Sequence, residues 1–301
     1  MKTPQLPIPE LSNKLGTKTE IWFKFENKHH LGSHKGRSIP LMMSENIKND
    51  LRSFVISSSG NAALAALRFT VSHNKNKPSH PITLTIFIGP SIAQNKYEKL
   101  LQEKGNSKSI AIIRSENPKQ SALQFSKENN AVWLRGSSDP LALTGYENLA
   151  EELGKINGLA AVFFAASSGT SAEGCFLGFK KIGKIPEIHI VQTPACHPLV
   201  NAWLAKTGKN EIPRSEDKSR ADAIVDIVGK RSDSLSGAII ESGGCGWICD
   251  NAEIDETLNI LNSVGQMDIT ANGALPVAGL FKAIKNGPGF SGPVACIIGG
   301  D

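Results

Sequence analysis

Residues 54–61 read Phe54-Val55-Ile56-Ser57-Ser58-Ser59-Gly60-Asn61, and an Ala- and Leu-rich segment follows them to about residue 73. The three apolar residues predict a short buried strand, the small polar residues predict a turn, and the Ala- and Leu-rich segment predicts a helix. A strand that passes through a turn into a helix is half of the βαβ unit from which parallel sheets are built. This stretch therefore favours an α/β fold.

The same order recurs along the chain. We expect strands at residues 21–26, 54–56, 82–88, 110–113, 131–134, 160–165, 188–191, 238–240 and 295–298. Most are short and wholly apolar, and helical segments separate several of them, which is typical of parallel sheets covered on both faces. We therefore predict an α/β protein of two domains, each with a parallel or mostly parallel sheet flanked by helices. The larger domain is expected to comprise residues 1–42 and 135–301, and the smaller one residues 43–134.

Composition and charge exclude several classes of protein. The chain has 301 residues, 40% of them hydrophobic and 20% charged, which argues against disorder, collagen and coiled coil. Its net charge of +5 comes from scattered basic residues, so we expect no nucleic-acid partner. No apolar run approaches the roughly 18 residues of a membrane helix, and the N-terminus lacks the apolar region of a secretory signal. With only five cysteines and no disulfide framework, a cytoplasmic location is expected.

Three turns of small residues carry the candidate chemistry. The lysine turn (residues 32–38) contains Lys35, and we expect a helix to begin after it, with Ser38 as N-cap and Pro40 in the first turn. Composition alone favours the alternative, an exposed lysine in a basic loop.

The other two turns are rich in serine. The first serine turn (residues 57–61) offers hydroxyl and backbone N–H groups at a helix start, which suit a carboxylate. The second serine turn (residues 167–171) offers the same groups for a phosphate. Taken singly, each could be an ordinary serine cap. No Cys or carboxylate cluster accompanies the histidines near residue 30, so no metal site is expected.

Taken together and in this order, the three turns resemble those of the fold-type II pyridoxal-phosphate enzymes. This family includes threonine synthase, the threonine and serine dehydratases, cysteine synthase and the tryptophan synthase β chain. The resemblance extends over nearly the whole chain and includes Thr3-Pro4, Gly145-Tyr146-Glu147, Val191-Gln192 and residues 274–282.

The resemblance implies pyridoxal 5'-phosphate as cofactor and a small amino acid as substrate. Lys35 would form the Schiff base with the cofactor and later move the α-proton of the substrate, and His34 would lie near the cofactor phosphate. Asn61 would bind the 3-oxygen of the cofactor ring. The substrate carboxylate would be held by Ser58, Ser59, Gly60 and Asn61, and the cofactor phosphate by Ser167, Ser168, Gly169, Thr170 and Ser171.

The sequence also departs from the family pattern. The second serine turn has fewer glycines than is usual, and the first lacks the acidic residue of tryptophan synthase β chains. Gly299 stands where the family places a Ser or Thr beside the pyridine nitrogen of the cofactor, so a water or Asp301 would have to take that place.

The function that the resemblance implies is a lyase or transferase of threonine synthase type, acting by elimination or replacement at the β or γ carbon. The alternatives are a serine/threonine ammonia-lyase, a cysteine-synthase-like enzyme, or a non-catalytic regulator or carrier that binds the cofactor. An unrelated sugar- or nucleotide-binding α/β protein is a further alternative. A homodimer is one expected assembly.

Overall fold

A computed structural model describes residues 2–265, 268–287 and 289–300. The chain forms two compact units, a larger one of Met1–Lys28 with Tyr146–Asp301 and a smaller one of His29–Gly145. The division expected at residues 42/43 falls inside helix α2 (Lys35–Lys48). Helix α6 (Leu141–Thr144) packs against α2, so residues 135–145 belong with the smaller unit rather than with the larger one.

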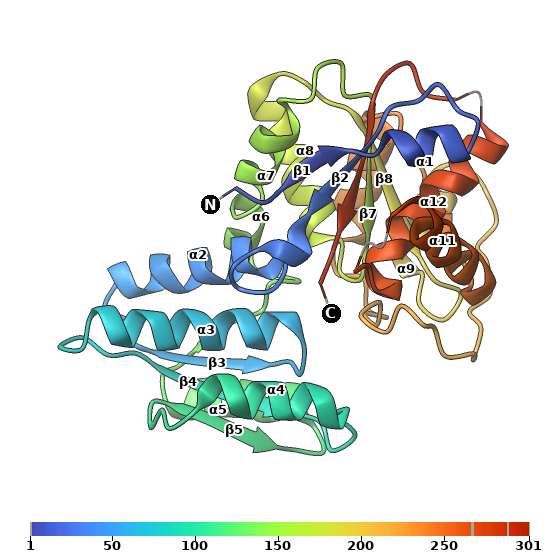
Figure 1. Cartoon of the computed structure of the whole chain (residues 1–301). Helices are drawn as coiled ribbons and strands as arrows, with labels where there is room; N and C mark the ends of the chain where they lie inside the picture. Colours follow the sequence, from blue (N-terminus) through green and yellow to red (C-terminus); the bar gives the residue numbers. More distant parts are fainter. Residues whose placement is uncertain (1, 266–267, 288, 301) are drawn as a thin grey trace. The chain divides into compact units, whose positions relative to one another are not determined.

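The larger unit is built on a mostly parallel sheet, as expected. Its strand order is β1 (Gln5–Pro7), β2 (Ile21–Phe25), β10 (Val294–Ile298), β7 (Ala161–Ala165), β8 (Glu187–Gln192) and β9 (Gly246–Ile248). β1 pairs antiparallel with β2, and every other pairing is parallel. Strands from the two ends of the chain, β2 and β10, therefore lie side by side (Figure 1).

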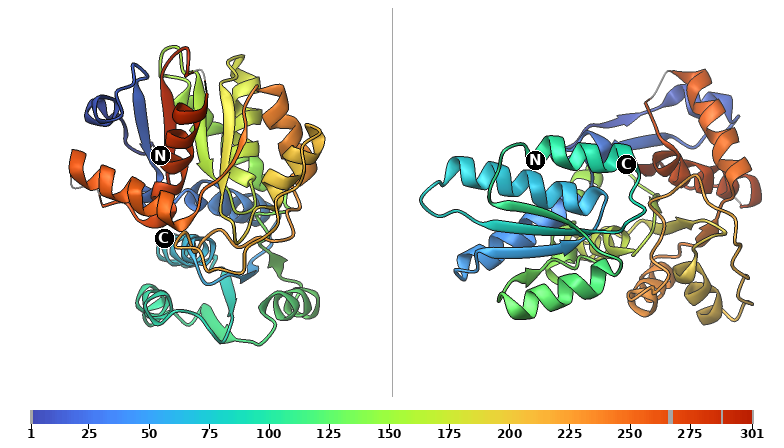
Figure 2. Two further views of the ribbon diagram at one scale, coloured as in Figure 1. Left: turned by 90° about the vertical axis from the view of Figure 1, so that its right-hand side faces the viewer. Right: turned by 90° about the horizontal axis from the view of Figure 1, so that it is seen from below.

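Helices cover both faces of this sheet. One face carries α1 (Pro9–Lys14), α11 (Asn251–Val264) and α12 (Ala271–Asn286). The other carries α7 (Glu147–Leu153), α8 (Thr170–Ile182), α9 (Pro198–Lys206) and α10 (Ser232–Glu241). The red α12 and the yellow-green α8 lie on opposite sides of the strands (Figure 2).

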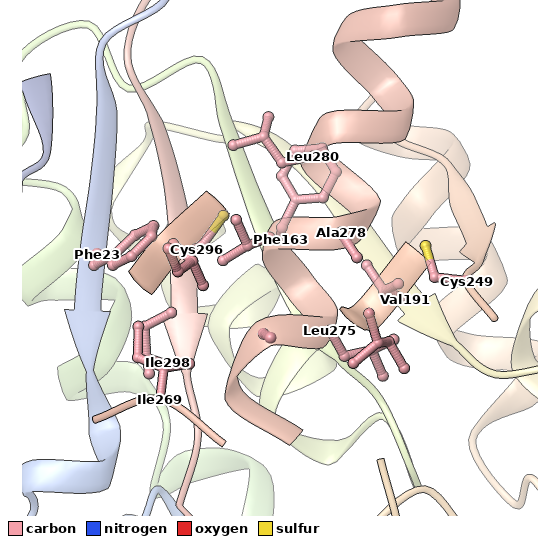
Figure 3. Packing of buried hydrophobic residues seen from close by; sticks show 14 of the residues in the cluster. Phe23, Phe163, Val191, Cys249, Ile269, Leu275, Ala278, Leu280, Cys296 and Ile298 are labelled. Atoms are coloured by element: carbon pink, nitrogen blue, oxygen red, sulfur yellow. The ribbon is translucent and has the colours of Figure 1, made fainter. Parts of the chain in front are cut away.

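The core under α12 shows why its sequence is almost wholly apolar. Leu275 and Leu280 of α12 are fully buried and belong to one cluster with Phe163 of β7 and Cys296 of β10 (Figure 3). Full burial of a Leu or Phe side chain contributes roughly 1.5–3 kcal/mol to folding. Helix and strands are therefore held together chiefly by the hydrophobic effect.

β2 is buried on both faces, although its residues alternate with period two. Ile21 and Phe23 pack into the cluster under α12, whereas Lys24 points to the opposite face and is only 1% exposed. The Lys24 ammonium forms an ion pair with Glu152 of α7 and donates a hydrogen bond to the carbonyl oxygen of Thr3 at 2.9 Å. A buried charge is tolerated because these partners replace water.

The smaller unit has a wholly parallel sheet in the order β5 (Ile110–Arg114), β4 (Thr83–Ile88), β3 (Ser53–Ser57) and β6 (Val132–Trp133). Helices α2, α3 (Asn61–Asn76), α4 (Gln94–Lys104) and α6 pack on one face. Helix α5 (Pro118–Glu128) packs on the other. Along the chain, the short 3-10 helix η1 (Glu26–Lys28) follows β2 directly, and the lysine turn comes next.

One expected strand is wrong. Residues 238–240 lie inside helix α10. Leu235, Ala238 and Ile239 are buried at the i, i+3, i+4 spacing of a helix face, and Ile240 is 45% exposed. A run of three apolar residues cannot distinguish a buried strand from a helix of this kind. In the part of the chain that the structure describes, no helix is long and apolar enough to cross a membrane.

Candidate active site

Both serine turns lie where doubly wound sheets bind ligands. β7 connects through α8 to β8 on one side, while β10 lies on its other side. β3 connects through α3 to β4 on one side, while β6 lies on its other side. Ligands of open α/β sheets bind outside the carboxyl ends of the strands at such switch points. The second serine turn follows β7 and the first follows β3, so each unit places one of them at its switch point.

Gly169 shapes the second serine turn. Its φ is +76°, in the left-handed region that favours glycine, and it is the N-cap of α8. A Cβ at this position would lie 2.4 Å from Cδ2 of Leu235, which is closer than two carbon atoms approach. Glycine is therefore favoured here by the backbone, and any larger residue would also require the buried Leu235 side chain of α10 to move.

The hydroxyl groups of this turn do not all have the same surroundings. The hydroxyls of Ser168 and Thr170 are hydrogen-bonded to each other at 2.9 Å. The Ser167 hydroxyl oxygen accepts hydrogen bonds from the backbone N–H groups of Val225 and Asp226, at 3.1 and 3.2 Å. Ser167 thus holds the loop that contains Val225 and Asp226 against the turn. Its hydroxyl oxygen acts as an acceptor in these contacts, so its O–H can still donate a hydrogen bond to a ligand.

Gln192 positions the second serine turn from the neighbouring strand β8. Its side chain is fully buried, its Nε2 donates to the carbonyl oxygen of Ala166 at 2.8 Å, and its Oε1 accepts from the backbone N–H groups of Leu199 and Val200 at 3.0 Å. The sequence marked this residue only as part of the family resemblance. Its role as a brace between the turn and the start of α9 depends on contacts that local patterns do not reveal.

The first turn of α8 also carries a buried ion pair. Glu173 and Arg231 have side chains only about a tenth exposed, and their charged atoms are 3.2 Å apart. A carboxylate near a helix N-terminus would oppose the binding of an anion there. Arg231 offsets this charge, so the start of α8 remains suited to a phosphate.

A hydrogen bond within the first serine turn stabilises its conformation. The N–H of Gly60 donates to the Ser58 hydroxyl at 3.3 Å, and Gly60 precedes Asn61, the first residue of α3. No atom lies within 4 Å of a Cβ built on Gly60, so this side of the turn faces open space. The N–H groups at the start of a helix lack intrahelical acceptors, which makes the turn suitable for a carboxylate.

Lys35 does not lie on the turn before the helix, as we expected, but is the first residue of α2. His34 is the N-cap in place of Ser38, and Pro40 lies inside the helix. Pro40 removes one intrahelical hydrogen bond, whose acceptor would be Gly36 four residues earlier. The helix tolerates this loss so close to its start. The Lys35 N–H donates to the Ser33 hydroxyl at 3.3 Å, and the Lys35 side chain is half-buried.

His34 is held neutral. Burial, and then the positive charges of Lys35 and Arg37, lower the pKa of His34 to about 3. A neutral imidazole carries no net charge, so it neither repels the Lys35 ammonium nor attracts a phosphate by charge. Its contribution to a phosphate would be a hydrogen bond rather than an ion pair.

Gly299 follows β10 directly, at the same edge of the sheet as the second serine turn, and is half-buried. It offers backbone groups only. Asp301, the other candidate for the pyridine nitrogen, lies outside the described residues. The larger unit thus brings the second serine turn and Gly299 to one edge, whereas Lys35 and the first serine turn belong to the smaller unit.

The residues present fit pyridoxal phosphate. The start of α8 supplies backbone N–H groups and the hydroxyls of Ser168, Thr170 and Ser171, which is a donor set for a phosphate ester. Lys35 supplies a primary amine for an aldehyde, and the start of α3 supplies donors for a carboxylate.

Comparisons with known proteins agree with this chemistry. A family model described as pyridoxal-phosphate dependent enzyme matches residues 1–300. Threonine synthase of Synechocystis sp. is 22% identical to this chain over 307 residues, covering 99% of this chain and 76% of that protein.

Solved structures share the fold. Threonine deaminase isoform 2 of Solanum lycopersicum, in its processed form, is 20% identical with a TM-score of 0.80, covering all of this chain and 84% of that one. Maize serine racemase is 18% identical with a TM-score of 0.75, covering all of this chain and 88% of that one. The protein therefore belongs to the pyridoxal-phosphate-dependent enzyme family, has the architecture of its fold type II, and uses pyridoxal 5'-phosphate as cofactor.

Proposed function

We propose that this protein is a lyase or transferase of threonine synthase type, which eliminates or replaces a group at the β or γ carbon of a small amino acid. The observation that carries the proposal is that all three candidate segments stand at helix starts. Lys35 begins α2, Asn61 begins α3 and Thr170 begins α8. Each start directs N–H groups and a partial positive charge outward, which suits a substrate carboxylate and a cofactor phosphate.

In this proposal Lys35 holds the cofactor through its Nζ and, once released from it, accepts the α-proton of the substrate. The backbone N–H groups and hydroxyls of residues 58–61 orient the substrate carboxylate, and Asn61 donates its amide to the 3-oxygen of the cofactor ring. Residues 167–171 hold the phosphate, and His34, being neutral, adds a hydrogen bond to it. When bound, pyridoxal phosphate supplies an electron sink for charge that develops at the α-carbon.

The attachment is tested by reducing the holoenzyme with borohydride and mapping the labelled peptide. We expect the pyridoxyl group on Lys35 and no visible absorption band in Lys35→Ala. Lys48→Ala is the matched control, because Lys48 is exposed on the same helix and pairs with Glu45. Label on another lysine would overturn the assignment.

The reaction is tested by incubating the holoenzyme with L-threonine, L-serine and their O-acylated or phosphorylated derivatives. Elimination or replacement releases a 2-oxo acid with ammonia, or a new amino acid. A D-amino acid as the only product would instead indicate a racemase, the activity named for the maize structure. An absorption spectrum that no amino acid changes would indicate a carrier or regulator that binds the cofactor without turning substrate over.

A further inference from the structure

A segment without regular structure, residues 221–226 of the larger unit, lies against the second serine turn, and we call it the strap. Its first half is anchored in the core, because Ala221 and Ile224 are buried in the hydrophobic cluster under α12. The two N–H groups at its other end donate to the Ser167 hydroxyl oxygen at 3.1 and 3.2 Å. The strap therefore connects the core under α12 to a hydroxyl of the turn that is expected to hold the cofactor phosphate.

Asn272 fixes the strap near the middle of its length. It is the second residue of α12 and is only 6% exposed. Its Oδ1 accepts from the backbone N–H of Ala223 at 3.0 Å, and its Nδ2 donates to the carboxylate of Asp222 at 2.9 Å. A backbone N–H can only donate and a carboxylate can only accept, so these two contacts require both the oxygen and the nitrogen of an amide.

Helix α12 gives Asn272 a rigid base. A Cβ built on the next residue, Gly273, would lie 3.0 Å from Cγ2 of Ile269 and 3.2 Å from Cγ2 of Ile298, so the helix start packs tightly against the end of β10. Leu275 in the same turn is fully buried. Because close-packed interiors transmit displacements rather than absorb them, the sheet sets the position of Asn272 and, through it, that of the strap.

The orientation of the Ser167 hydroxyl depends on the strap. A serine side chain has three staggered χ1 rotamers, and the strap stabilises the one whose oxygen faces its two N–H groups. These contacts use the acceptor capacity of the oxygen and leave its hydrogen for a ligand. A hydroxyl that is already oriented loses less conformational freedom when a phosphate binds, so the strap should strengthen binding.

We propose that Asn272 is a positioning residue for cofactor binding, which holds the strap and thereby orients the Ser167 hydroxyl toward the cofactor phosphate. This rests on the proposed function, because it assumes that residues 167–171 hold the phosphate. Asn272 acts through the strap and does not itself contact the cofactor. Binding of the phosphate and attachment of the strap then stabilise each other, as thermodynamic linkage requires.

The first test is the affinity of the apoenzyme for pyridoxal phosphate, measured by titration. Asn272→Ala should weaken it about tenfold. Asn251→Ala is the matched control, because the Asn251 side chain makes the same two kinds of contact just before the strap. It accepts from the N–H of Arg220 at 2.9 Å and donates to the carbonyl oxygen of Lys218 at 3.0 Å. Equal losses in the two variants would overturn the proposal.

Pyridoxal, which lacks the phosphate, separates positioning from a general loss of structure. Both compounds carry the same ring and aldehyde, so only the contacts of the phosphate differ. Asn272→Ala should weaken the binding of pyridoxal by about twofold at most, against about tenfold for pyridoxal phosphate. Equal losses for the two compounds would assign Asn272 a merely structural role.

An exchange of side chains tests the contact itself. Asn272→Asp places a carboxylate against that of Asp222 and should weaken cofactor binding more than Asn272→Ala does, because like charges repel. The double variant Asn272→Asp/Asp222→Asn restores one donor and one acceptor between the two positions, and the carboxylate still accepts from Ala223. It should recover most of the affinity. A double variant no better than Asn272→Asp would overturn the proposal.

Ser167→Ala distinguishes a failure of this proposal from a failure of the proposed function. It should weaken the binding of pyridoxal phosphate, and adding Asn272→Ala should cause no further loss, because both changes act on one hydroxyl. If Ser167→Ala leaves the affinity unchanged, the phosphate site of the proposed function is wrong and the role of Asn272 fails with it. If Ser167→Ala weakens binding but Asn272→Ala does not, or if their losses add, only the positioning role is wrong.

Discussion

Gly169 is the residue whose identity the second serine turn tolerates least. Gly169→Ala places a Cβ in the left-handed region and 2.4 Å from Leu235 Cδ2, so we expect it to cost about 2–4 kcal/mol of folding free energy. Gly183→Ala is the matched control at the other end of α8, with a φ of +71° and no atom within 4 Å of the added Cβ. It should cost only about 1 kcal/mol.

Urea unfolding of both variants measures these costs, and titration with pyridoxal phosphate measures cofactor affinity. We expect affinity to fall only in Gly169→Ala, since that change displaces the N–H groups at the helix start. Equal losses of stability in the two variants would mean that the contact with Leu235 is not important.

His34 gives a second prediction at this scale, a dependence of stability on pH. Its pKa is about 3 in the folded chain, whereas an ordinary histidine titrates near 6.5. Below pH 6.5 this histidine is protonated in the unfolded chain but stays neutral in the folded chain. The free energy of unfolding therefore decreases toward pH 3 by up to about 1.4 kcal/mol per pH unit. Above pH 6.5 this contribution is constant.

His34→Asn should remove this contribution to the loss of stability at low pH. The free energies of unfolding of both proteins are measured in urea from pH 7 to pH 4, and the stability of the wild type relative to the variant should decrease as pH falls. Parallel curves would show that His34 is protonated equally in the folded and unfolded chains.

At the scale of the element, α8 depends on the ion pair in its first turn. Arg231→Met leaves the buried Glu173 carboxylate without its partner, which we expect to cost about 3–5 kcal/mol. Cofactor affinity should also fall, because an uncompensated negative charge would lie four residues into the helix that we propose binds the cofactor phosphate.

The double variant Glu173→Gln/Arg231→Met should recover most of both losses, since it removes the stranded charge. Unfolding free energies and cofactor dissociation constants of the four members of this cycle are the measurements. A double variant no better than Arg231→Met would assign the loss to the packing of Arg231 instead.

The helices and strands also show which element bounds can be predicted from local sequence patterns. Strands β3, β4, β7 and β10 were predicted within one residue, because their apolar runs stop at turn residues, although such a run does not by itself exclude a buried helix. Residues 238–240 were misassigned because their helical partner at Leu235 lies outside the run. The start of α2 was misplaced by four residues, because we placed Pro40 in the first turn of the helix.

For the whole molecule, removal of the cofactor should lower stability by mass action. At a cofactor concentration of about 100 times the dissociation constant, binding to the folded chain alone adds about 2.7 kcal/mol. We expect the melting temperature of the holoenzyme to fall by several degrees when the cofactor is stripped, and to recover when it is returned. Lys35→Ala should show a smaller difference, measured by calorimetry, because only non-covalent binding remains.

The sequence by itself determined the α/β class, the three small-residue turns and the family, since each depends on neighbours within a few residues and on short motifs in a fixed order. Only the tertiary structure decided which charges are buried and which are paired. Lys24 with Glu152 and Arg231 with Glu173 meet across 128 and 58 residues of chain. A cavity of about 460 Å³ in the smaller unit likewise joins residues 57–59 with residues 116–120, which no local pattern relates. Periodicity reports which face of an element is apolar, but the partner of a charge or the wall of a cavity is set by segments that only folding brings together.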